Sequence, residues 1–219
     1  MKVALIGATG FVGKHLQKEL LHRGHEVTAL VRKSGNVSSD ARLSFVMADA
    51  YSPESIAQAV RNQDAVISAF NPGWNDHALF DNFTRGNDSI VRGVETSGVR
   101  RYIVIGGAGS LFVAPGVQLV DTEAFKTHVP ANIVPGALAA RDALNTLRDN
   151  TTLDWTFVSP PAMLEEGERT GVYRLGKDDL LMDGDKPAGI SVADLAVAVV
   201  DELEKPAHLR KRFTAARAA

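Results

Sequence analysis

The chain has 219 residues, 45% of them hydrophobic and 23% charged, and this length and composition are typical of one globular domain. A net charge of −2 gives no electrostatic case for binding nucleic acid or an acidic membrane. Because cysteine is absent, disulfides, thiolate metal sites and a cysteine nucleophile are excluded, and we expect no metal site. The first apolar run breaks at Gly7 and no run is long enough to cross a bilayer, so we expect a cytoplasmic protein.

The first fourteen residues predict a turn that binds a dinucleotide. An apolar run over residues 3–6 precedes three spaced glycines, and residues 15–21 repeat apolar side chains with the period of a helix. In such a unit Gly7 permits the tight turn, Gly10 lets the backbone approach a pyrophosphate, and Gly13 lets the helix pack closely on the strand. Amides at the helix start then bind the phosphate oxygens, unless this is a plain strand-to-helix turn. The predicted cradle comprises Gly7, Thr9, Gly10, Phe11, Val12 and Gly13.

Beyond this turn, strands and helices are expected to alternate. Apolar runs predict strands over residues 26–32, 43–48, 65–69, 101–105 and 154–159. Periodicity and capping signals predict helices over residues 53–61, 75–96, 135–148 and 191–204. Ser52 and Ser191 are expected N-caps, the second in a capping box with Asp194, and Gly98 is expected to stop the 75–96 helix. This alternation predicts an α/β protein with a Rossmann-type, doubly wound parallel sheet.

Other segments depart from this regular pattern. Residues 33–40 read as a polar loop, and residues 111–132 are irregular. After Pro161, residues 162–189 are rich in glycine and charge, and we expect them to form most of a small C-terminal substrate lobe within the single domain 1–219. The segments 111–132 and 162–189 are therefore expected to set the substrate.

Further expectations concern one helix face, two additional strands and the oligomeric state. The apolar face of the 75–96 helix is predicted to be Leu79, Phe80, Phe83, Ile90, Val91 and Val94. Residues 172–175 predict an extra strand, and the basic residues 210–212 before Phe213 predict a solvated terminal strand. No apolar surface helix stands out, so we expect a monomer rather than an oligomer.

The end of the second strand indicates which nucleotide is bound. A protein that binds NAD usually places a carboxylate there for the ribose 2′-hydroxyl, but this chain has Arg32 and Lys33. A guanidinium can pair with a 2′-phosphate and stack on adenine, so the sequence favours NADP(H) over NAD(H). The alternative is a solvated basic pair at a strand end.

Residues that follow the other strands are expected to line the rest of the nucleotide site. Asp49 and Ala50 follow the third strand, where Asp49 could accept from the adenine amino group or simply be a polar strand terminus. Ligands of such sheets bind outside the carboxyl ends of the strands. We therefore expect the adenine–ribose wall and the nicotinamide end to be formed by Ala69 and Phe70 and by Gly106 and Gly107, respectively.

With these residues in place, nearly the whole chain resembles the atypical short-chain dehydrogenases/reductases that carry a G-x-x-G-x-x-G cradle. It is most similar to their small NAD(P)H-binding members, which include flavin and biliverdin reductase-like proteins and NmrA-like regulators. The resemblance implies that Pro160 and Pro161 fix a backbone carbonyl against the nicotinamide carboxamide. The segments that support it are Gly7–Gly13, Arg32, Asp49, Gly106–Ser110, Ser159–Pro161, Gly167–Gly171 and Ile190–Ala196.

Catalytic members of the wider family use a Tyr-x-x-x-Lys pair on the helix after the fifth strand, and this chain departs from that pattern. No tyrosine lies between residues 103 and 172. Tyr173 and Lys177 match the spacing, but Gly176 and Val172 place them on a predicted strand in the C-terminal lobe. Reduction of an ordinary ketone, which a positioned acid accelerates by about 10²–10⁴-fold, is therefore disfavoured.

The main hypothesis is an NADPH-dependent oxidoreductase that transfers hydride to a planar conjugated small molecule such as a flavin or quinone. Such an acceptor spreads its charge, so orientation and exclusion of water matter most. Ser110 is a candidate hydrogen-bonding residue or a plain loop serine, and His128 is a candidate proton donor or a surface histidine. A non-catalytic NADP(H) sensor that binds a regulatory partner protein is the alternative. A sugar-nucleotide epimerase or dehydratase is disfavoured by the missing pair and the short lobe.

Overall fold

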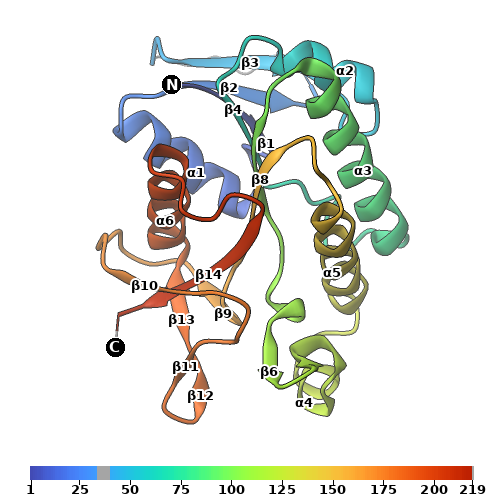
Figure 1. The fold of residues 1–219 in the computed structure, drawn as a ribbon, viewed down its shortest axis with the longest axis vertical. Helices are drawn as coiled ribbons and strands as arrows, with labels where there is room; N and C mark the ends of the chain where they lie inside the picture. Colours follow the sequence, from blue (N-terminus) through green and yellow to red (C-terminus); the bar gives the residue numbers. More distant parts are fainter. Residues whose placement is uncertain (34–39, 219) are drawn as a thin grey trace.

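A computed structural model describes residues 1–33 and 40–218, so most of the predicted polar loop, residues 34–39, lies outside the described residues. The described residues form an eight-stranded central sheet in the order β10-β14-β8-β5-β4-β1-β2-β3 (Figure 1). Neighbouring strands are parallel except for β10, which is antiparallel to β14. The strands are β1 (Lys2–Ile6), β2 (Glu26–Val31), β3 (Leu43–Met47), β4 (Ala65–Ser68), β5 (Arg101–Ile105), β8 (Asp154–Ser159), β10 (Tyr173–Gly176) and β14 (Lys211–Arg217). The predicted doubly wound parallel sheet is confirmed, with its order reversing between β1 and β4.

Two layers of helices cover the sheet, as Figure 1 shows. Helices α1 and α6 pack together on one face, whereas α2, α3 and α5 lie side by side on the other. Side chains alternate along β5, so Ile103 belongs to the apolar cluster under the first layer and Tyr102 to that under the second. These helices are α1 (Phe11–His22), α2 (Pro53–Val60), α3 (Leu79–Ser97), α5 (Val134–Arg148) and α6 (Val192–Glu204).

The predicted N-caps and the stop at Gly98 are confirmed. The capping box is only half formed, because the Asp194 carboxylate accepts from Thr170 and Gly171 instead, and the predicted start of α3 is wrong. The hydroxyls of Ser52 and Ser191 accept hydrogen bonds from the amides of Ser55 and Asp194, and Gly98 ends α3 in the left-handed conformation. Helix α3 begins at Leu79 rather than at residue 75. The carboxylate of Asp76 accepts from the Ala78 amide and from the Asn82 side chain, which holds residues 76–78 in a turn.

One residue of the predicted apolar face of α3 was assigned wrongly. Phe80 is 36% exposed, whereas Leu79, Phe83, Ile90 and Val94 are buried. Val91 is half-buried and packs against the core, as predicted. Phe80 lies about 100° around the axis from Leu79, at the edge of this face and in the first turn, where the next residue, Asp81, is also exposed.

The C-terminal strand is buried, which corrects the prediction of a solvated strand. Strand β14 lies between β8 and β10, Phe213 is in the core, and the side chain of Arg212 is only 1% exposed. Arg212 tolerates burial because its guanidinium is held by Ser110 and Asp178. The predicted strand at residues 172–175 is confirmed as β10.

Short elements lie beyond the carboxyl ends of the parallel strands, at the lower end of Figure 1. Residues 111–132 contain a hairpin, a 3-10 turn and a short helix, and residues 162–191 contain two strand pairs. These elements are η1 (Ala108–Ser110), β6 (Phe112–Ala114), β7 (Val117–Gln118), η2 (Leu119–Asp121), α4 (Glu123–His128), β9 (Met163–Glu165), β11 (Met182–Asp183), β12 (Lys186–Pro187) and β13 (Gly189–Ser191). None of the helices in the described ranges combines the length and apolarity needed to cross a membrane.

The loop over residues 167–171 is anchored to both helices of the first layer. Asp194 at the start of α6 accepts from the amides of Thr170 and Gly171 at 2.8 and 2.7 Å, and from the Thr170 hydroxyl. Arg169 donates two hydrogen bonds to Glu19 of α1. These bonds fix the loop against the face of the sheet that α1 and α6 cover.

Candidate functional site

Two of the three glycines in the first turn, Gly7 and Gly13, have no room for a side chain. Gly7 has a φ of +76°, and a Cβ there would lie 2.3 Å from the backbone oxygen of Ala69. A Cβ on Gly13 would lie 2.0 Å from the Gly7 oxygen, so the helix contacts the turn directly. The Gly10 amide donates to the Gly7 carbonyl at 2.9 Å. This geometry is the tight turn and close helix packing predicted for a phosphate cradle.

The start of α1 leaves backbone amides available to an anion. Gly10 is the N-cap and has no side chain to bond them, and the first turn holds no acidic residue. Thr9 is exposed, Phe11 is 47% exposed and Val12 is half-buried, so backbone at this turn reaches the surface. A pyrophosphate fits such a site because the amides and the helix dipole both favour negative charge.

The predicted adenosine end lies at the carboxyl ends of β2 and β3. Arg32 and Lys33 are exposed directly after β2. One carboxylate oxygen of Asp49 accepts from the Tyr51 amide at 2.9 Å, which shapes the turn before α2, and Ala50 is half-buried. Asp49 therefore has a structural bond, while its role toward adenine stays a prediction.

The structure also brings the side chains of Tyr51, Phe70 and Arg85 together at the predicted adenosine end, a cluster that the sequence did not reveal. The Arg85 guanidinium of α3 lies 4.6 Å from the centre of the Tyr51 ring, and the Tyr51 and Phe70 rings meet edge to face at 5.9 Å. Burial raises the pKa of Tyr51, Asp76 raises it further, and the charges of Arg85 and Arg32 oppose the rise. Arg85 and Arg32, from distant segments, thus both favour the charged form of the Tyr51 side chain. The spacing of these residues in the sequence does not indicate that they are near one another.

At the predicted nicotinamide end, small residues bring the backbone close to its neighbours. A Cβ on Gly106 would lie 1.9 Å from the Phe157 ring, and one on Gly107 would lie 3.5 Å from Ala140. Pro160, after β8, is buried, and Ala69, which follows β4 and was predicted for the adenine–ribose wall with Phe70, is half-buried. These residues all follow central strands at the same edge of the sheet, as predicted, and their contacts with the nucleotide stay predictions.

Ser110 is held by the buried arginine of β14. The Arg212 Nη1 donates to both the hydroxyl and the carbonyl oxygen of Ser110 at 2.9 Å, and Ser110 itself is 2% exposed. Burial lowers the pKa of Arg212, and Asp178 counteracts that effect. Since the Ser110 oxygen accepts from Arg212, its own proton remains available for donation. Sequence analysis missed Arg212 because the basic run 210–212 looked solvated.

His128 lies in a different environment from Ser110. It is the last residue of α4, it is exposed, and its Nδ1 donates to the Ala124 carbonyl at 2.8 Å. The roles of Ser110 and His128 in catalysis stay predictions.

The three tyrosines of the chain lie away from the position of a catalytic pair. Tyr173 is on β10, as predicted, and its hydroxyl donates to Asp201 of α6. Tyr102 is buried under α3 and α5, and Tyr51 is at the adenosine end. In the described part of the chain, no group of three His, Asp or Glu side chains is placed to hold a metal ion.

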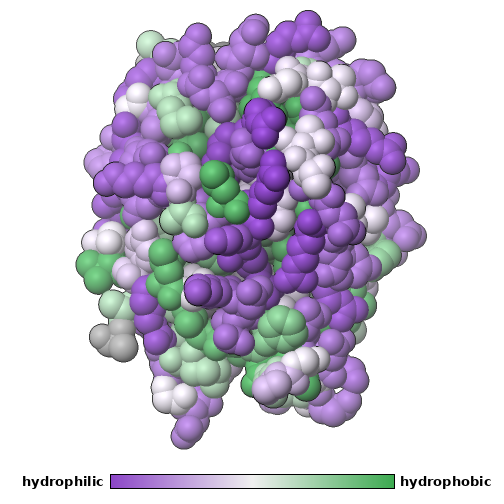
Figure 2. Space-filling view, in the orientation of Figure 1, coloured by the Kyte–Doolittle hydropathy of each residue, from purple (hydrophilic) through white to green (hydrophobic). Residues whose placement is uncertain are grey.

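A cavity of about 710 Å³, called the lobe cavity here, lies between the two irregular segments. Its walls come entirely from residues 112–124 and 179–187, and they are mostly apolar. The amide of Phe112 donates to the Asp178 carbonyl, and that of Leu180 donates to the Phe112 carbonyl, which ties the segments together. Figure 2 shows hydrophobic residues gathered at the lower end of the molecule, where Figure 1 places β6. The lining residues are Phe112, Val113, Ala114, Pro115, Gly116, Leu119, Thr122, Ala124, Asp179, Leu180, Met182 and Pro187.

Comparison with known proteins places this site in a family. Residues 7–206 match the family described as NAD(P)H-binding. The uncharacterized protein YwnB of Bacillus subtilis is 37% identical over 217 residues, which are 98% of this chain and 97% of YwnB.

Two solved structures share the whole fold. A candidate epimerase from Bacteroides thetaiotaomicron is 43% identical with a TM-score of 0.90, over 100% of this chain and 97% of that chain. A candidate NADH-flavin reductase from Streptococcus pneumoniae is 34% identical with a TM-score of 0.82, over 100% of both chains. With its glycine cradle and its strand order, the chain therefore belongs to the NAD(P)H-binding family, among the atypical short-chain dehydrogenases/reductases.

Proposed function

We propose that this protein is an NADPH-dependent oxidoreductase that transfers hydride to a planar conjugated acceptor such as a flavin or quinone. The observation that carries the proposal is the lobe cavity, whose apolar walls come from the two segments expected to set the substrate. Phe112, which lines this cavity, comes only two residues after Ser110. The cavity therefore begins shortly after the end of β5 along the chain. Its lining residues are mostly exposed, so this is an open apolar groove, which can orient a flat ring by contact with one of its faces.

The choice of NADP(H) rests on positive charge at the adenosine end. Arg32 is exposed at the end of β2, where a carboxylate would favour NAD, and Arg85 stands over the nearby Tyr51 ring. Two guanidinium groups would therefore lie near the 2′ position of the ribose. Guanidinium groups bind the 2′-phosphate of NADP(H) more strongly than the 2′-hydroxyl of NAD(H).

The chemistry requires one hydride and one proton to reach the acceptor. When bound, NADPH would supply the hydride, which carries both electrons of the reduction. Ser110, whose oxygen accepts from Arg212, can donate a hydrogen bond to an acceptor oxygen or nitrogen as charge develops there. The proton that the acceptor takes up comes from water, so no Tyr-x-x-x-Lys pair is needed for an acceptor that delocalises charge.

The flavin reductase-like and epimerase-like relatives suggest different chemistry, and the site favours the first. A sugar nucleotide needs many polar partners, whereas the lobe cavity is lined mainly by apolar side chains such as Val113, Leu119 and Leu180. Epimerases of the extended family also use the tyrosine that this chain lacks at that position.

The test is steady-state oxidation of NADPH with a panel of acceptors that includes free flavin, a quinone and a simple ketone. We expect turnover with the flavin or the quinone and little with the ketone. Ala114→Trp, which narrows the lobe cavity, should raise the acceptor KM and leave the NADPH KM unchanged. Asp185→Trp, exposed in the β11–β12 turn, is the matched control.

The same experiment separates the reductase from a sensor. A protein that binds both NADPH and NADP+ but oxidises NADPH with no member of the panel would contradict the proposal. That result would instead support a non-catalytic regulator, whose partner protein should then be captured in a manner that depends on the ratio of the two nucleotides.

A further inference from the structure

One buried side chain of the central sheet bonds both segments that form the lobe cavity. Arg212 lies on β14, between β8 and β10, and its side chain is only 1% exposed. Its Nη1 donates to the hydroxyl and to the carbonyl oxygen of Ser110, both at 2.9 Å. Its Nε and Nη2 donate to the Asp178 carboxylate at 3.0 and 2.6 Å, and Nη2 also donates to the Asp178 carbonyl at 3.2 Å. These bonds use all five N–H donors of the guanidinium.

The two walls of the lobe cavity start beside the residues that Arg212 holds. The first wall begins two residues after Ser110, and the second begins directly after Asp178. The walls are also joined by two backbone bonds of 2.8 Å, from the Phe112 amide to the Asp178 carbonyl and from the Leu180 amide to the Phe112 carbonyl. The Asp178 carbonyl therefore accepts from both walls' partner amide and the buried guanidinium. Arg212 thus fixes the starts of both walls to the central sheet.

This arrangement needs the shape of an arginine and not only its charge. A guanidinium is a planar fork that bonds groups on two sides, whereas a lysine ammonium has three donors on one atom and cannot reproduce the bonds to both Ser110 and Asp178. The carboxylate of Asp178 is half-exposed, and Arg148 lies 3.6 Å from it. That carboxylate therefore keeps a cationic neighbour and contact with water when Arg212 is shortened to lysine.

We propose that Arg212 is a positioning residue for the acceptor, because it sets the separation of the two cavity walls and the orientation of Ser110. This inference rests on the proposed function, since it takes the lobe cavity as the acceptor site. Acceptor binding should then depend on Arg212. Binding of NADPH should not, because the glycine cradle and Arg32 follow β1 and β2, which are separated from β14 by three strands of the sheet.

Arg101 provides a matched control, because it is also a buried arginine held by several bonds. Its Nη1 donates to the Asp154 carbonyl and the Thr156 hydroxyl, and its Nη2 donates to the Glu202 carboxylate. Arg101 is the first residue of β5, so these bonds lie at the end of the strands opposite to the lobe cavity. Arg101→Lys should lower the melting temperature as Arg212→Lys does, but it should leave the acceptor site unchanged.

The test compares the two lysine variants in quinone-dependent oxidation of NADPH, in NADPH titration and in amide hydrogen exchange. Arg212→Lys should raise the quinone KM about fivefold or more, the value of one hydrogen bond, and should keep the NADPH Kd within about twofold of the wild type. Exchange at the Phe112 and Leu180 amides should accelerate about fivefold or more in Arg212→Lys and less in Arg101→Lys. Asp178→Asn, at a half-exposed position, weakens the same bonds from the other partner and should raise the quinone KM in the same direction.

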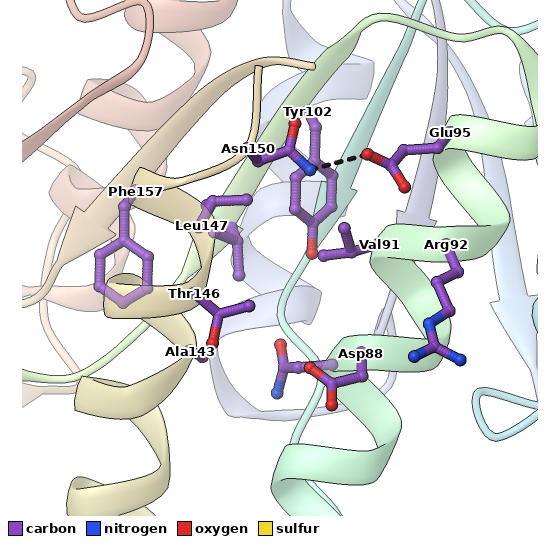
Figure 3. Close-up of a pocket in the computed structure, with 12 residues that line it drawn as sticks. Asp88, Val91, Arg92, Glu95, Tyr102, Ala143, Thr146, Leu147, Asn150 and Phe157 are labelled. Carbon is purple, nitrogen blue, oxygen red and sulfur yellow. Dashed lines mark hydrogen bonds between the residues drawn. The ribbon is translucent and has the colours of Figure 1, made fainter. Parts of the chain in front are cut away.

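Binding of lumichrome, a flat alloxazine that is followed by its fluorescence, measures acceptor affinity without turnover. A second groove, of about 260 Å³, lies between α3 and α5 and is lined in part by the exposed Thr146 (Figure 3). Thr146→Trp narrows that groove and should leave lumichrome affinity unchanged. Arg212→Lys should weaken lumichrome binding about fivefold.

Several results would overturn the proposal. They are no binding of lumichrome to the wild type, its loss in Thr146→Trp, equal effects of the two lysine variants on the acceptor, and unchanged exchange at the Phe112 and Leu180 amides in Arg212→Lys. A wild type that binds lumichrome but oxidises NADPH with no acceptor would contradict the reductase instead. Lumichrome affinity and amide exchange would then still decide whether Arg212 positions a flat ligand in the lobe cavity.

Discussion

At the scale of single residues, the cradle glycines have separable roles. A Cβ on Gly13 would collide with backbone at 2.0 Å, whereas a Cβ on Gly10 would lie 3.2 Å from the Gly7 oxygen, where a shift of a few tenths of an ångström suffices. Gly13→Ala should therefore destabilise the fold by about 1–3 kcal/mol. Gly10→Ala should keep nearly normal stability but weaken NADPH binding about tenfold or more, because the methyl group occupies phosphate space.

Thermal unfolding and nucleotide titration of the two variants distinguish these roles. If Gly13→Ala melts like the wild type, the close packing of α1 on the turn is not essential. If Gly10→Ala binds NADPH with unchanged affinity, the pyrophosphate does not lie at the start of α1.

Arg32 carries the second prediction at this scale. Arg32→Asp should weaken NADPH by at least about tenfold more than NADH, because a carboxylate repels the 2′-phosphate and accepts from a ribose hydroxyl. Lys205→Asp makes the same charge change on an exposed residue after α6 and should alter neither affinity. Equal affinities for wild type and Arg32→Asp, measured by titration with both nucleotides, would remove Arg32 from the site.

At the scale of elements, the sequence predicted those whose signals are local. The glycine turn, the caps at Ser52 and Ser191 and the stop at Gly98 each depend on residues within a few positions. The start of α3 was missed because of a local turn at Asp76, but the larger error arose where a distant partner decides the outcome. Arg212 reads as solvated until β14 is placed between β8 and β10, where Ser110 and Asp178 satisfy its charge.

The loop over residues 167–171 gives a prediction for one such long-range contact. Asp194→Ala removes the acceptor of the Thr170 and Gly171 amides and should cost about 1–3 kcal/mol of stability. Hydrogen exchange at those two amides should accelerate more than exchange in the central strands. Asp185→Ala, in an exposed turn, is the control, and equal protection in both variants would show that Asp194 does not hold the loop.

At the scale of the whole molecule, buried carboxylates make the fold sensitive to acid. Hydrogen bonds from Arg169 lower the pKa of Glu19 below its ordinary 4.5, against burial and with help from Arg23. Burial opposes the same shift in Glu202, but hydrogen bonds from His208 and the Ala207 amide still lower its pKa. A carboxylate whose pKa is lower in the folded state stabilises the fold fully above the ordinary pKa and loses that effect as the pH falls through the lowered value.

Glu19→Gln tests this dependence. The free energy of unfolding of the wild type should exceed that of the variant at neutral pH, and the difference should shrink as the pH falls below about 4.5. Urea unfolding across this range measures it. A difference that is constant with pH would mean that Glu19 stabilises the protein by packing rather than by charge.

The nucleotide half of the molecule was also easier to predict than the acceptor half. The residues of the cradle follow one another along the chain, so the sequence indicates them directly. The lobe cavity joins residues 112–124 to residues 179–187, and the Tyr51 ring meets Arg85 across two elements. Such meetings depend on the tertiary fold, and no periodicity or spacing encodes them.

The most direct test of the central claim is a single turnover without oxygen. The protein loaded with NADPH is mixed with increasing quinone, and the loss of nicotinamide absorbance is followed with ordinary NADPH and with NADPH deuterated at the transferred position. We predict a loss that saturates with quinone, that is slower with deuterium, and that is slower again in Ala114→Trp. A protein that binds NADPH but shows no such loss, or a loss as fast without the protein, would contradict the assignment as a reductase.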